Sequence, residues 1–514
     1  MSKRLPYPQN DVAEGAPLYW RSLEEKARLD DPSQCAALAA ERAQEFTPEQ
    51  TAHDGVTRRG FMNLLGASMA LVGAAGCRRP VEHIAPYAKM PEEIVPGVPN
   101  FYATVYTRRS EAIGLLVESH EGRPTKVEGN PDHPSSLGAT DLVTQAAILD
   151  LYDPDRSGKP VTGSAESTWE EAEKALDAKL AAHAADGGAK LRLLVEPTVS
   201  PSVMRLREAV RRRFPAAQIV TYSPASDENA LAGAALATGQ VLHIVPQLDK
   251  AKAIVSFDSD FLQTESGAVR NTKLFSAGRR LRAPSDDMSR LYVAEGTFST
   301  TGANADHRLR VAPSQVERLV LAVLAELGDK HKVELGALGD VARRLGKVDA
   351  LGAPAVAWVR AVAADLALHR GASVALAGSR QPARVHALVF AMNRLLGSLD
   401  RLAATRVAVD GEGPAGVGAV AALVKEMQAG RVDTLLILGG NPVYDAPADL
   451  AFGDALAKVP FSLHLSEHWD ETGQKATWHL PRSHAFEAWG DARSLDGTVA
   501  VQQPLIAPLR DTRS

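Results

Sequence analysis

Short apolar runs alternate with longer amphipathic stretches from about residue 100 onward. The short runs are rich in Leu, Ile, Val and Ala, which is typical of strands buried on both faces. The predicted strands are Gly114–Ser119, Leu191–Glu196, Gln218–Tyr222, Ala253–Phe257, Leu291–Ala294, Ser373–Ala377, Thr434–Leu438 and Phe461–Leu465. The predicted helices between them are Thr168–Ala185, Ser202–Phe214, Gln315–Leu327, Pro354–Leu368, Gln381–Gly397 and Val417–Gly430.

This alternation predicts an α/β fold with parallel sheets covered by helices on both faces. We expect two doubly wound units, at about 160–330 and 350–480, in which ligands would sit beyond the carboxyl ends of the strands. The predicted domains are an N-terminal extension (1–56), a signal region (57–77), an N-terminal segment (78–160), a first α/β domain (161–345) and a second α/β domain with an extended C-terminal segment (346–514).

Three loops that follow predicted strands carry the most distinctive sequence motifs. Gly439-Gly440-Asn441-Pro442 follows one buried strand, and the stretches Ser373–Pro382 and Ala253–Glu265 make similar transitions from strand to polar loop. Two glycines let a backbone approach a ligand closely, and Asn-Pro favours a turn. The pattern is compatible both with a bound nucleotide and with a tight strand-to-helix connection.

Composition narrows the class of protein. The chain has 514 residues, 45% hydrophobic and 23% charged, with a net charge of −5, so it is neither wholly disordered nor basic enough to indicate nucleic-acid binding. Its two cysteines, Cys35 and Cys77, cannot supply the four thiolates of an iron–sulfur cluster, and no CxxCH run for haem c is present.

Residues 57–77 resemble a twin-arginine export signal. Arg58, Arg59 and Phe61 precede a mildly apolar run of about 15 residues, shorter than the roughly 20 needed to span a bilayer. An amphipathic helix with two solvated arginines is the alternative. Cys77 ends a run of small residues, as at a lipid-attachment site, so it is either acylated or an unmodified cysteine.

Several motifs resemble the molybdopterin oxidoreductase superfamily, which includes dimethyl sulfoxide reductase. The matching text is Gly129–Pro134 (GNPDHP), Gly439–Pro442 (GGNP), Glu471-Thr472-Gly473, His479-Leu480-Pro481, Glu487, Trp489-Gly490-Asp491 and Asp496-Gly497. The resemblance covers about residues 57–508. It implies the doubly wound parallel-sheet fold of that superfamily. The sequence departs from the family pattern in stopping at Ser514, so the C-terminal domain that helps to cradle the cofactor in active enzymes is expected to be lacking.

One branch of the superfamily is more similar still. The late signal, the YWRSLEE opening and the CRRPVEHIAPY segment resemble the molybdopterin-like half of the large iron–sulfur subunit of bacterial alternative complex III. This resemblance implies a cofactor-free scaffold in a quinol-oxidising complex of respiratory or photosynthetic electron transfer. The implied partners are a ferredoxin-like iron–sulfur protein or domain, a multihaem cytochrome c and integral membrane quinol-binding subunits. The implied location is the periplasmic face of the cytoplasmic membrane.

The absence of cysteines at two positions is consistent with a site that has lost its metal. Phe101–Ser119 stands where active members carry cluster ligands, and it has no cysteine, while Ala139-Thr140-Asp141 stands where another cysteine is common. Some active members bind molybdenum through Ser or Asp. The alternative function is therefore a catalytic molybdopterin subunit of the polysulfide or oxyanion reductase type, with a non-cysteine molybdenum ligand.

Other polar clusters have both a functional and a structural interpretation. The histidines 464, 468, 479 and 484 are either metal ligands or hydrogen-bonded structural residues, and a strand context favours the second. Asp258, Asp260 and Glu265 are expected to form a solvated loop rather than a metal or acid–base site. Asp132 and His133 are expected in a turn rather than in a proton relay. The arginines 279, 280 and 282 form a local basic patch that suits an acidic partner or a phospholipid head group.

Overall fold

The computed structural model describes Arg28, Asp31, Ser33, Gln34, Glu92 and residues 94–108, 111–399, 401–408 and 415–514. The chain divides into two compact units, Met1–Met90 and Pro91–Ser514, and the elements below belong to the second. The predicted export signal (Arg58, Arg59, Phe61) and the predicted attachment site Cys77 lie outside the described residues. No helix in the described part of the chain is both long and apolar enough to cross a membrane.

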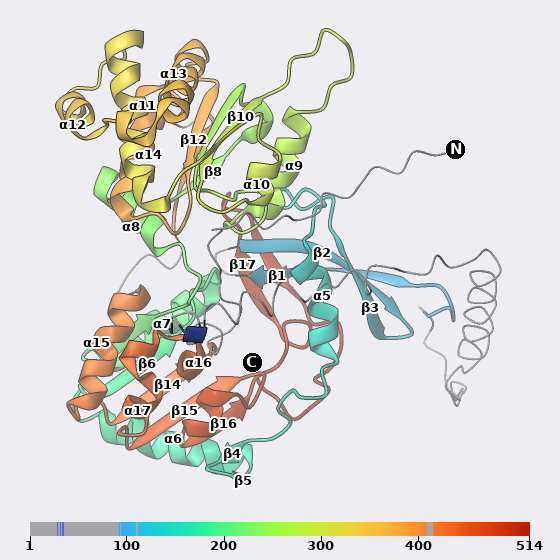
Figure 1. Ribbon diagram of the computed structural model, residues 1–514. Coiled ribbons are helices and arrows are strands. Elements are labelled where there is room, and N and C mark those ends of the chain that lie inside the picture. Colours follow the sequence, from blue (N-terminus) through green and yellow to red (C-terminus); the bar gives the residue numbers. More distant parts are fainter. Residues whose placement is uncertain are drawn as a thin grey trace. The chain divides into compact units, whose positions relative to one another are not determined.

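A seven-stranded sheet forms the base of the second unit (Figure 1). Its strands, in spatial order, are β5 (Ala165–Glu166), β4 (Val161–Thr162), β16 (Trp478–Pro481), β15 (Phe461–Ser466), β14 (Thr434–Leu438), β6 (Leu191–Val195) and β7 (Gln218–Thr221). The five strands from β16 to β7 are parallel, whereas β4 and β5 pair antiparallel at one edge.

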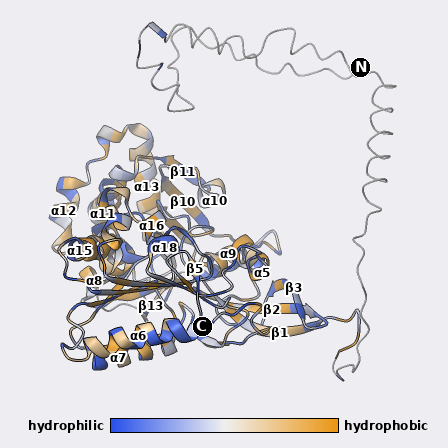
Figure 2. Ribbon diagram, turned by 90° about the horizontal axis from the view of Figure 1, so that it is seen from below, coloured by the Kyte–Doolittle hydropathy of each residue, from blue (hydrophilic) through white to orange (hydrophobic). Residues whose placement is uncertain are grey.

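Helices cover both faces of this sheet because its strands carry apolar side chains on both sides. The helices α15 (Gly416–Gln428) and α17 (Phe452–Leu456) pack on Leu194 and Ile437, whereas α6 (Trp169–His183) and α7 (Pro201–Arg213) cover the opposite face. Hydrophilic and hydrophobic positions alternate along α6 and α7 (Figure 2). Both helices begin at a side-chain cap, Thr168 for α6 and Ser200 for α7, each accepting a backbone N–H of the first turn.

A second parallel sheet has four strands, in the order β11 (His307–Arg310), β10 (Arg290–Glu295), β9 (Ala253–Phe257) and β12 (Ser373–Ala377). One face packs on α11 (Val316–His331), α13 (Ala353–Leu368) and α14 (Ala383–Leu395), and the other on α9 (Ala268–Gly278). The pair β8 (Leu242–Pro246) and β13 (Ala403–Val407) is antiparallel. The remaining helices here are α8 (Glu228–Thr238), α10 (Thr300–Ala303) and α12 (Leu338–Leu345).

A small antiparallel sheet of β1 (Asn100–Arg108), β2 (Glu111–His120) and β3 (Arg123–Gly129) packs with α5 (Leu142–Leu151). The hairpin of β17 (Gly490–Arg493) and β18 (Val499–Gln502) lies beside β1. The Ser494 hydroxyl donates to the Ala112 carbonyl at 2.9 Å, which ties the hairpin to β2. Short helices α16 (Pro442–Asp445) and α18 (Glu471–Lys475) follow β14 and β15.

The predicted α/β fold is confirmed, and every predicted strand and helix overlaps an observed one. The pairing of the strands differs from the prediction of two units built from consecutive stretches of chain. The strands β6 and β7 share a sheet with β14, β15 and β16, and β12 joins the sheet of β9, β10 and β11. The alternation of strands and helices indicates parallel sheets but carries no information on which strands become neighbours.

Candidate functional site

The order in which the chain adds strands to the seven-stranded sheet reverses between β6 and β14. From β6 the chain continues to β7 on one side, and from β14 it continues to β15 and β16 on the other, although β6 and β14 are neighbours. Ligands of open α/β sheets bind beyond the carboxyl ends of the strands at such a switch point. Glu196 follows β6, and Gly439 and Gly440 follow β14, so these residues form the floor of the expected site.

Glu196 fills the space above the glycine turn. Gly439 and Gly440 have φ of +82° and +71°, a conformation that favours glycine. A Cβ on Gly439 would lie 2.1 Å from Oε2 of Glu196 and 3.0 Å from Nη1 of Arg482. The two glycines therefore do allow a close approach, but the group that approaches is a carboxylate of the chain itself.

Arg482 lies between two carboxylates at this edge of the sheet. Its Nη1 is 3.6 Å from Oε2 of Glu196, and its Nη2 is 3.2 Å from Oε1 of Glu467, the residue that follows β15. Burial disfavours the cation, but the charges of Glu467 and Glu196 outweigh this cost and hold the pKa of Arg482 above its ordinary value. Arg482 therefore interacts with two carboxylates at once.

Asp445, at the end of α16, adds to the acidity of this region. Burial, reinforced by the charges of Glu196 and Asp470, raises the pKa of Asp445 to about 6, although a backbone N–H bond from Asn441 acts in the opposite direction. The Asp445 carbonyl accepts a hydrogen bond of 2.8 Å from the Tyr222 hydroxyl. Near neutral pH the switch point therefore carries an excess of negative charge.

A cleft of about 500 Å³ opens beyond the strand ends, and its lining includes Glu196, Glu467, Arg482, His484 and Trp489. His484 is only 2% exposed, and burial holds its pKa below the ordinary value. Its Nδ1 accepts the backbone N–H of Phe486 at 3.1 Å, so the neutral ring carries its hydrogen on Nε2.

Asp491 closes one end of the same cleft and has a structural role. Its carboxylate accepts hydrogen bonds from the hydroxyls of Ser200 and Ser202, and from the backbone N–H of Ser202. Burial opposes its ionisation, but these hydrogen bonds prevail and hold the pKa of Asp491 below the ordinary value. The start of α7 and the β17–β18 hairpin are thereby joined.

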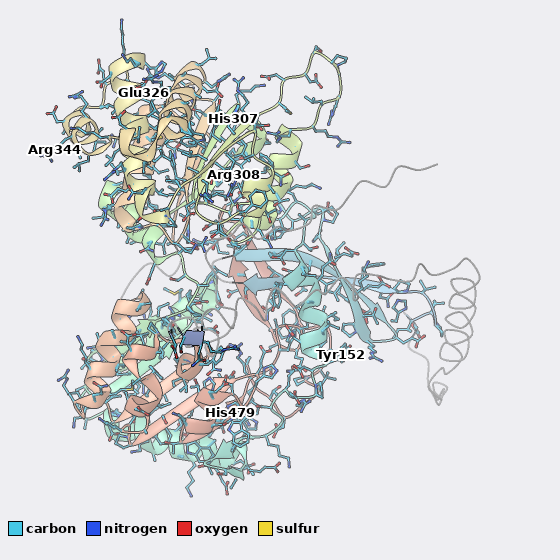
Figure 3. The ribbon with its side chains drawn as sticks, viewed as in Figure 1. Tyr152, His307, Arg308, Glu326, Arg344 and His479 are labelled. Carbon is cyan, nitrogen blue, oxygen red and sulfur yellow. The ribbon has the colours of Figure 1, made fainter. Side chains whose placement is uncertain are left out.

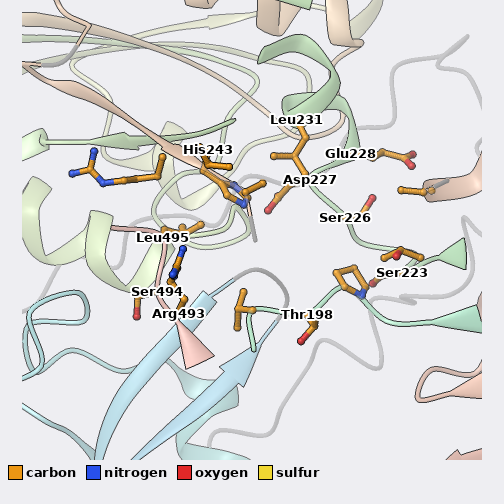
Figure 4. Close-up of a pocket in the computed structure, with 18 of the residues that line it drawn as sticks. Thr198, Ser223, Ser226, Asp227, Glu228, Leu231, His243, Arg493, Ser494 and Leu495 are labelled. Atoms are coloured by element: carbon orange, nitrogen blue, oxygen red, sulfur yellow. The ribbon is translucent and has the colours of Figure 1, made fainter. Parts of the chain in front are cut away.

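A smaller pocket of about 140 Å³ borders the cleft and shares Thr198 and Ser223 with it (Figure 4). Asp227 and His243 lie close together in this pocket; burial lowers the pKa of His243, and the Asp227 charge offsets part of that effect. A Cβ on Gly416, the first residue of α15, would lie 1.1 Å from Oε2 of Glu228. A carboxylate thus also occupies the amino end of α15, where an external anion would otherwise be favoured.

The sequence motifs meet at the same edge of the seven-stranded sheet. The Asn441 side-chain oxygen accepts the Thr472 hydroxyl at 2.7 Å, and the Asn441 amide donates to Glu471 at 2.7 Å, so the GGNP and ETG motifs hold each other. His464 bonds the Gly440 carbonyl at 2.9 Å, and His479, within β16 (Figure 3), bonds the Ser157 hydroxyl at 2.7 Å.

The histidines fit the structural interpretation. His468 contacts the Asp153 carboxylate at 3.3 Å, and burial lowers the pKa of His479 to about 3, which leaves that ring neutral. Within the described ranges, no group of three or more His, Cys, Asp or Glu side chains is arranged to hold a metal ion. His133 lies in a turn, as predicted, with its Nδ1 accepting the Ser136 N–H at 3.2 Å.

The loop after β9 corrects one expectation. Asp258 and Asp260 were expected in a solvated loop, but both are buried; Asp258 accepts from Gln381 at 2.9 Å and Asp260 from the Thr301 hydroxyl at 2.7 Å. A Cβ on Gly378 would lie 1.9 Å from the Asp258 carbonyl oxygen, so the loops after β9 and β12 touch. In the basic patch, Arg279 forms a bidentate pair with Asp306.

Sequence reasoning missed the charged residues that follow the strands. Glu196 was assigned to the end of a strand, and Arg482 and Glu467 were not singled out at all. A signal was present, because each charged residue directly follows the last residue of a strand. That signal gains meaning only once β6, β14, β15 and β16 are known to be neighbours.

Comparison with known proteins places the fold. A solved structure, acetylene hydratase from Pelobacter acetylenicus, matches with a TM-score of 0.63 over 80% of this chain and 67% of its own, at 14% sequence identity. The chain has the molybdopterin oxidoreductase fold. A curated protein of Nitratidesulfovibrio vulgaris, the molybdopterin-binding-like subunit of menaquinone reductase, is 26% identical over 503 residues, or 89% of this chain and 70% of its own, which supports the superfamily. No protein-family model matches the chain.

The switch point of this molybdopterin oxidoreductase fold is a poor fit for an anionic, phosphate-bearing pterin cofactor. Such a group needs cations and free backbone N–H groups at the strand ends. Here the Glu196 carboxylate fills the space above the glycine turn, and Arg482 is already paired with Glu196 and Glu467. The sequence between residues 78 and 514 also contains no cysteine that could ligate molybdenum.

Proposed function

We propose that this chain is a cofactor-free scaffold subunit of a membrane-associated quinone oxidoreductase complex, of the alternative complex III type. The fold and the curated relative, a molybdopterin-binding-like subunit of menaquinone reductase, support a molybdopterin-like subunit of a quinone-reactive complex. The motifs of the alternative complex III branch favour quinol oxidation. The main observation in support of a subunit without a cofactor is the position of the Glu196 carboxylate over Gly439.

A scaffold of this kind contributes to electron transfer through its rigidity. The two parallel sheets are covered on both faces and have apolar cores, so they form a stiff body. Electron tunnelling depends steeply on the distance between redox centres. A stiff subunit that contacts several partners would hold their centres at constant separations without carrying a centre itself.

The proposed partners carry the redox chemistry. They are a ferredoxin-like iron–sulfur protein or domain, a multihaem cytochrome c and integral membrane quinol-binding subunits. The chain would reach the periplasmic face of the cytoplasmic membrane by twin-arginine export through Arg58, Arg59 and Phe61, with Cys77 as an additional site of membrane attachment. Export after folding suits a subunit with large parallel sheets, because such sheets form slowly.

Metal analysis tests the proposal directly. The chain would be purified from a molybdate-supplied host that makes the pterin cofactor, beside a molybdenum enzyme from the same host as a positive control. We expect background molybdenum and no pterin in the extract, whereas the control enzyme should contain about one metal per chain. Near-stoichiometric molybdenum would instead establish the catalytic alternative, a polysulfide or oxyanion reductase with a non-cysteine ligand.

A further inference from the structure

The four-stranded sheet has a switch point of its own. From β9 the chain continues to β10 and β11 on one side, whereas β12 lies on the other side of β9. Ligands of open α/β sheets bind beyond the carboxyl ends of the strands at such a point. A pocket of about 110 Å³ lies there, walled by α8, β8, α14 and the loops after β9 and β12. Pockets for drug-sized ligands measure roughly 300–1,000 Å³, so this one suits only a small molecule.

One wall of this pocket holds a buried ring nitrogen without a partner. His386, on α14, is 7% exposed and lines the pocket, and its Nε2 makes no hydrogen bond to any residue that the structure describes. Burial lowers the pKa of His386 to about 4, while hydrogen bonds to the backbone of Gly378 and Gln381 act in the opposite direction. Because Nε2 has no partner, these bonds come from Nδ1–H, and Nε2 of the neutral ring is an unused acceptor. A guest that donates a hydrogen bond would satisfy it.

Two carboxylates line the same pocket. Asp227, which precedes α8, accepts the Ser266 hydroxyl at 2.7 Å. Glu265, in the loop after β9, accepts the Ser379 N–H at 3.0 Å. Burial, reinforced by the Asp227 charge, raises the pKa of Glu265, although hydrogen bonds from Ser379 act in the opposite direction, as does the charge of nearby Arg380. The described residues that line the pocket include no lysine or arginine, so a cationic guest would supply the missing positive charge.

These groups fit the ammonium group of a small amine. Its N–H bonds match the unused acceptor of His386 and the carboxylates, and its charge is opposite to theirs. Burial lowers the pKa of His243, the remaining titratable residue of the lining, and so favours its neutral ring. The apolar side chains of Leu231, Phe261 and Val389 suit a short alkyl chain. A metal ion fits less well, because no three His, Cys, Asp or Glu side chains of the described ranges are arranged to hold one.

We propose that this pocket binds a small primary amine as its ammonium ion. The ammonium donates to Nε2 of His386 and to the carboxylate of Asp227, Glu265 supplies a second negative charge, and the alkyl chain packs on Leu231. Asp227, Leu231 and His243 also line the pocket of Figure 4, so the two pockets adjoin at these residues. The site is separate from the cleft at β6 and β14, and the inference goes beyond the scaffold function, which does not require it. A bound amine would stabilise the folded chain by mass action.

The test titrates the full chain with n-propylammonium chloride and with two probes that each lack one of its properties. 1-Propanol has a similar shape but no charge, whereas tetramethylammonium has the charge but no N–H donor. Saturation-transfer NMR of each probe measures binding, and thermal unfolding measures the stabilisation. We expect saturable binding of propylammonium with a dissociation constant of about 1 mM, which is reasonable for so small a ligand. Both comparison probes should bind about tenfold more weakly or not at all.

Variants locate the site on the chain. Asp227→Asn and His386→Phe should each weaken the binding of propylammonium by about tenfold, because each removes one acceptor of the ammonium. Asp340→Asn is the matched control, since the side chain of Asp340 is 94% exposed and lies outside the pocket. Thermal unfolding without amine checks that each variant folds. Glu265→Gln, which keeps the size of the side chain, is expected to weaken binding as well and replaces His386→Phe if that variant does not fold.

The outcomes decide for or against the amine site. Weaker binding in the pocket variants, with unchanged binding in Asp340→Asn, supports it. Equal binding of propylammonium and tetramethylammonium overturns it, as does unchanged binding in Asp227→Asn and Glu265→Gln. If propylammonium shows no saturable binding up to about 20 mM, the pocket holds water only and the inference is refuted. The scaffold function is tested separately by metal analysis, so failure of the amine leaves it standing.

Discussion

The ion pair between Arg156 and Glu487 is the interaction whose removal should cost this fold most. The side chains are 1% and 0% exposed, and two hydrogen bonds of 3.1 and 2.5 Å join them. Nη1 of Arg156 also donates to the Leu151 carbonyl at 2.8 Å, and Glu487 accepts the backbone N–H groups of His484 and Leu509 at 2.9 Å each. The pair thus links the segment after α5 to both sides of the β17–β18 hairpin.

Removal of one partner leaves a buried charge without compensation. Glu487→Gln keeps the shape of the side chain but leaves the Arg156 guanidinium buried beside a neutral amide, and Arg156→Met leaves the carboxylate with two backbone donors only. Each change should lower the free energy of unfolding by about 3–5 kcal/mol. The double variant should lose less than the sum of the single changes, by about 2–3 kcal/mol, because it leaves neither charge behind.

Urea unfolding of the four proteins measures this cycle, with far-UV circular dichroism and tryptophan fluorescence recorded together. Coincident transitions allow a single free energy to be assigned to each protein. Lys159→Met is the matched control, because Lys159 pairs with Glu166 at the exposed surface and its loss should cost at most about 1 kcal/mol. A loss below about 1 kcal/mol in both single variants, or strictly additive losses, would show that the pair is not buried as described.

Two further changes test the switch point. Asp445→Asn should stabilise the protein by about 1–2 kcal/mol at pH 8 and have no effect below about pH 4. The raised pKa of Asp445 means that, between these pH values, the folded state holds a proton that the unfolded state has released. The stability of the wild-type protein therefore falls as the pH rises from the ordinary carboxyl pKa to about 6. Urea unfolding at both pH values measures this, and a pH-independent gain would contradict it. Gly439→Ala should destabilise the protein by about 1–3 kcal/mol, because residue 439 has a positive φ and the new methyl group would contact Glu196. The shift in melting temperature measures this loss, and adding Glu196→Ala to the same chain should reduce it only in part. An unchanged melting temperature in Gly439→Ala would exclude the contact.

The secondary structure was readable from the sequence because the strands are fully buried. The strands β6, β9 and β14 appear as short apolar runs, and the helices between them carry capping residues such as Thr168 and Ser200. The small sheet was harder to predict. In β3 polar and exposed positions predominate, so this strand produces no continuous apolar signal. The separate strand β18 has only four residues, and none of them is fully buried.

The site was readable only in part, because its residues come from strands that are distant in sequence. The glycine turn at Gly439 can be recognised from the local sequence. Its neighbour Glu196 lies more than two hundred residues earlier, and the contact exists because β6 and β14 pair in parallel. Local patterns report local conformation, whereas the register of a parallel sheet depends on contacts between remote segments. The same limit explains why the pairing of β12 with β9 was not foreseen.

The acidity of the strand ends bears on function more directly than the missing cysteines do. A partner chain could in principle supply cluster ligands, and serine or aspartate could replace a cysteine at molybdenum, so a shortage of thiolates leaves a catalytic role open. A carboxylate over the glycine turn disfavours an anionic cofactor at that place. An anionic cofactor would have to displace Glu196, break its ion pair with Arg482 and approach Glu467 and Asp445. Each of these steps raises the free energy of the loaded state.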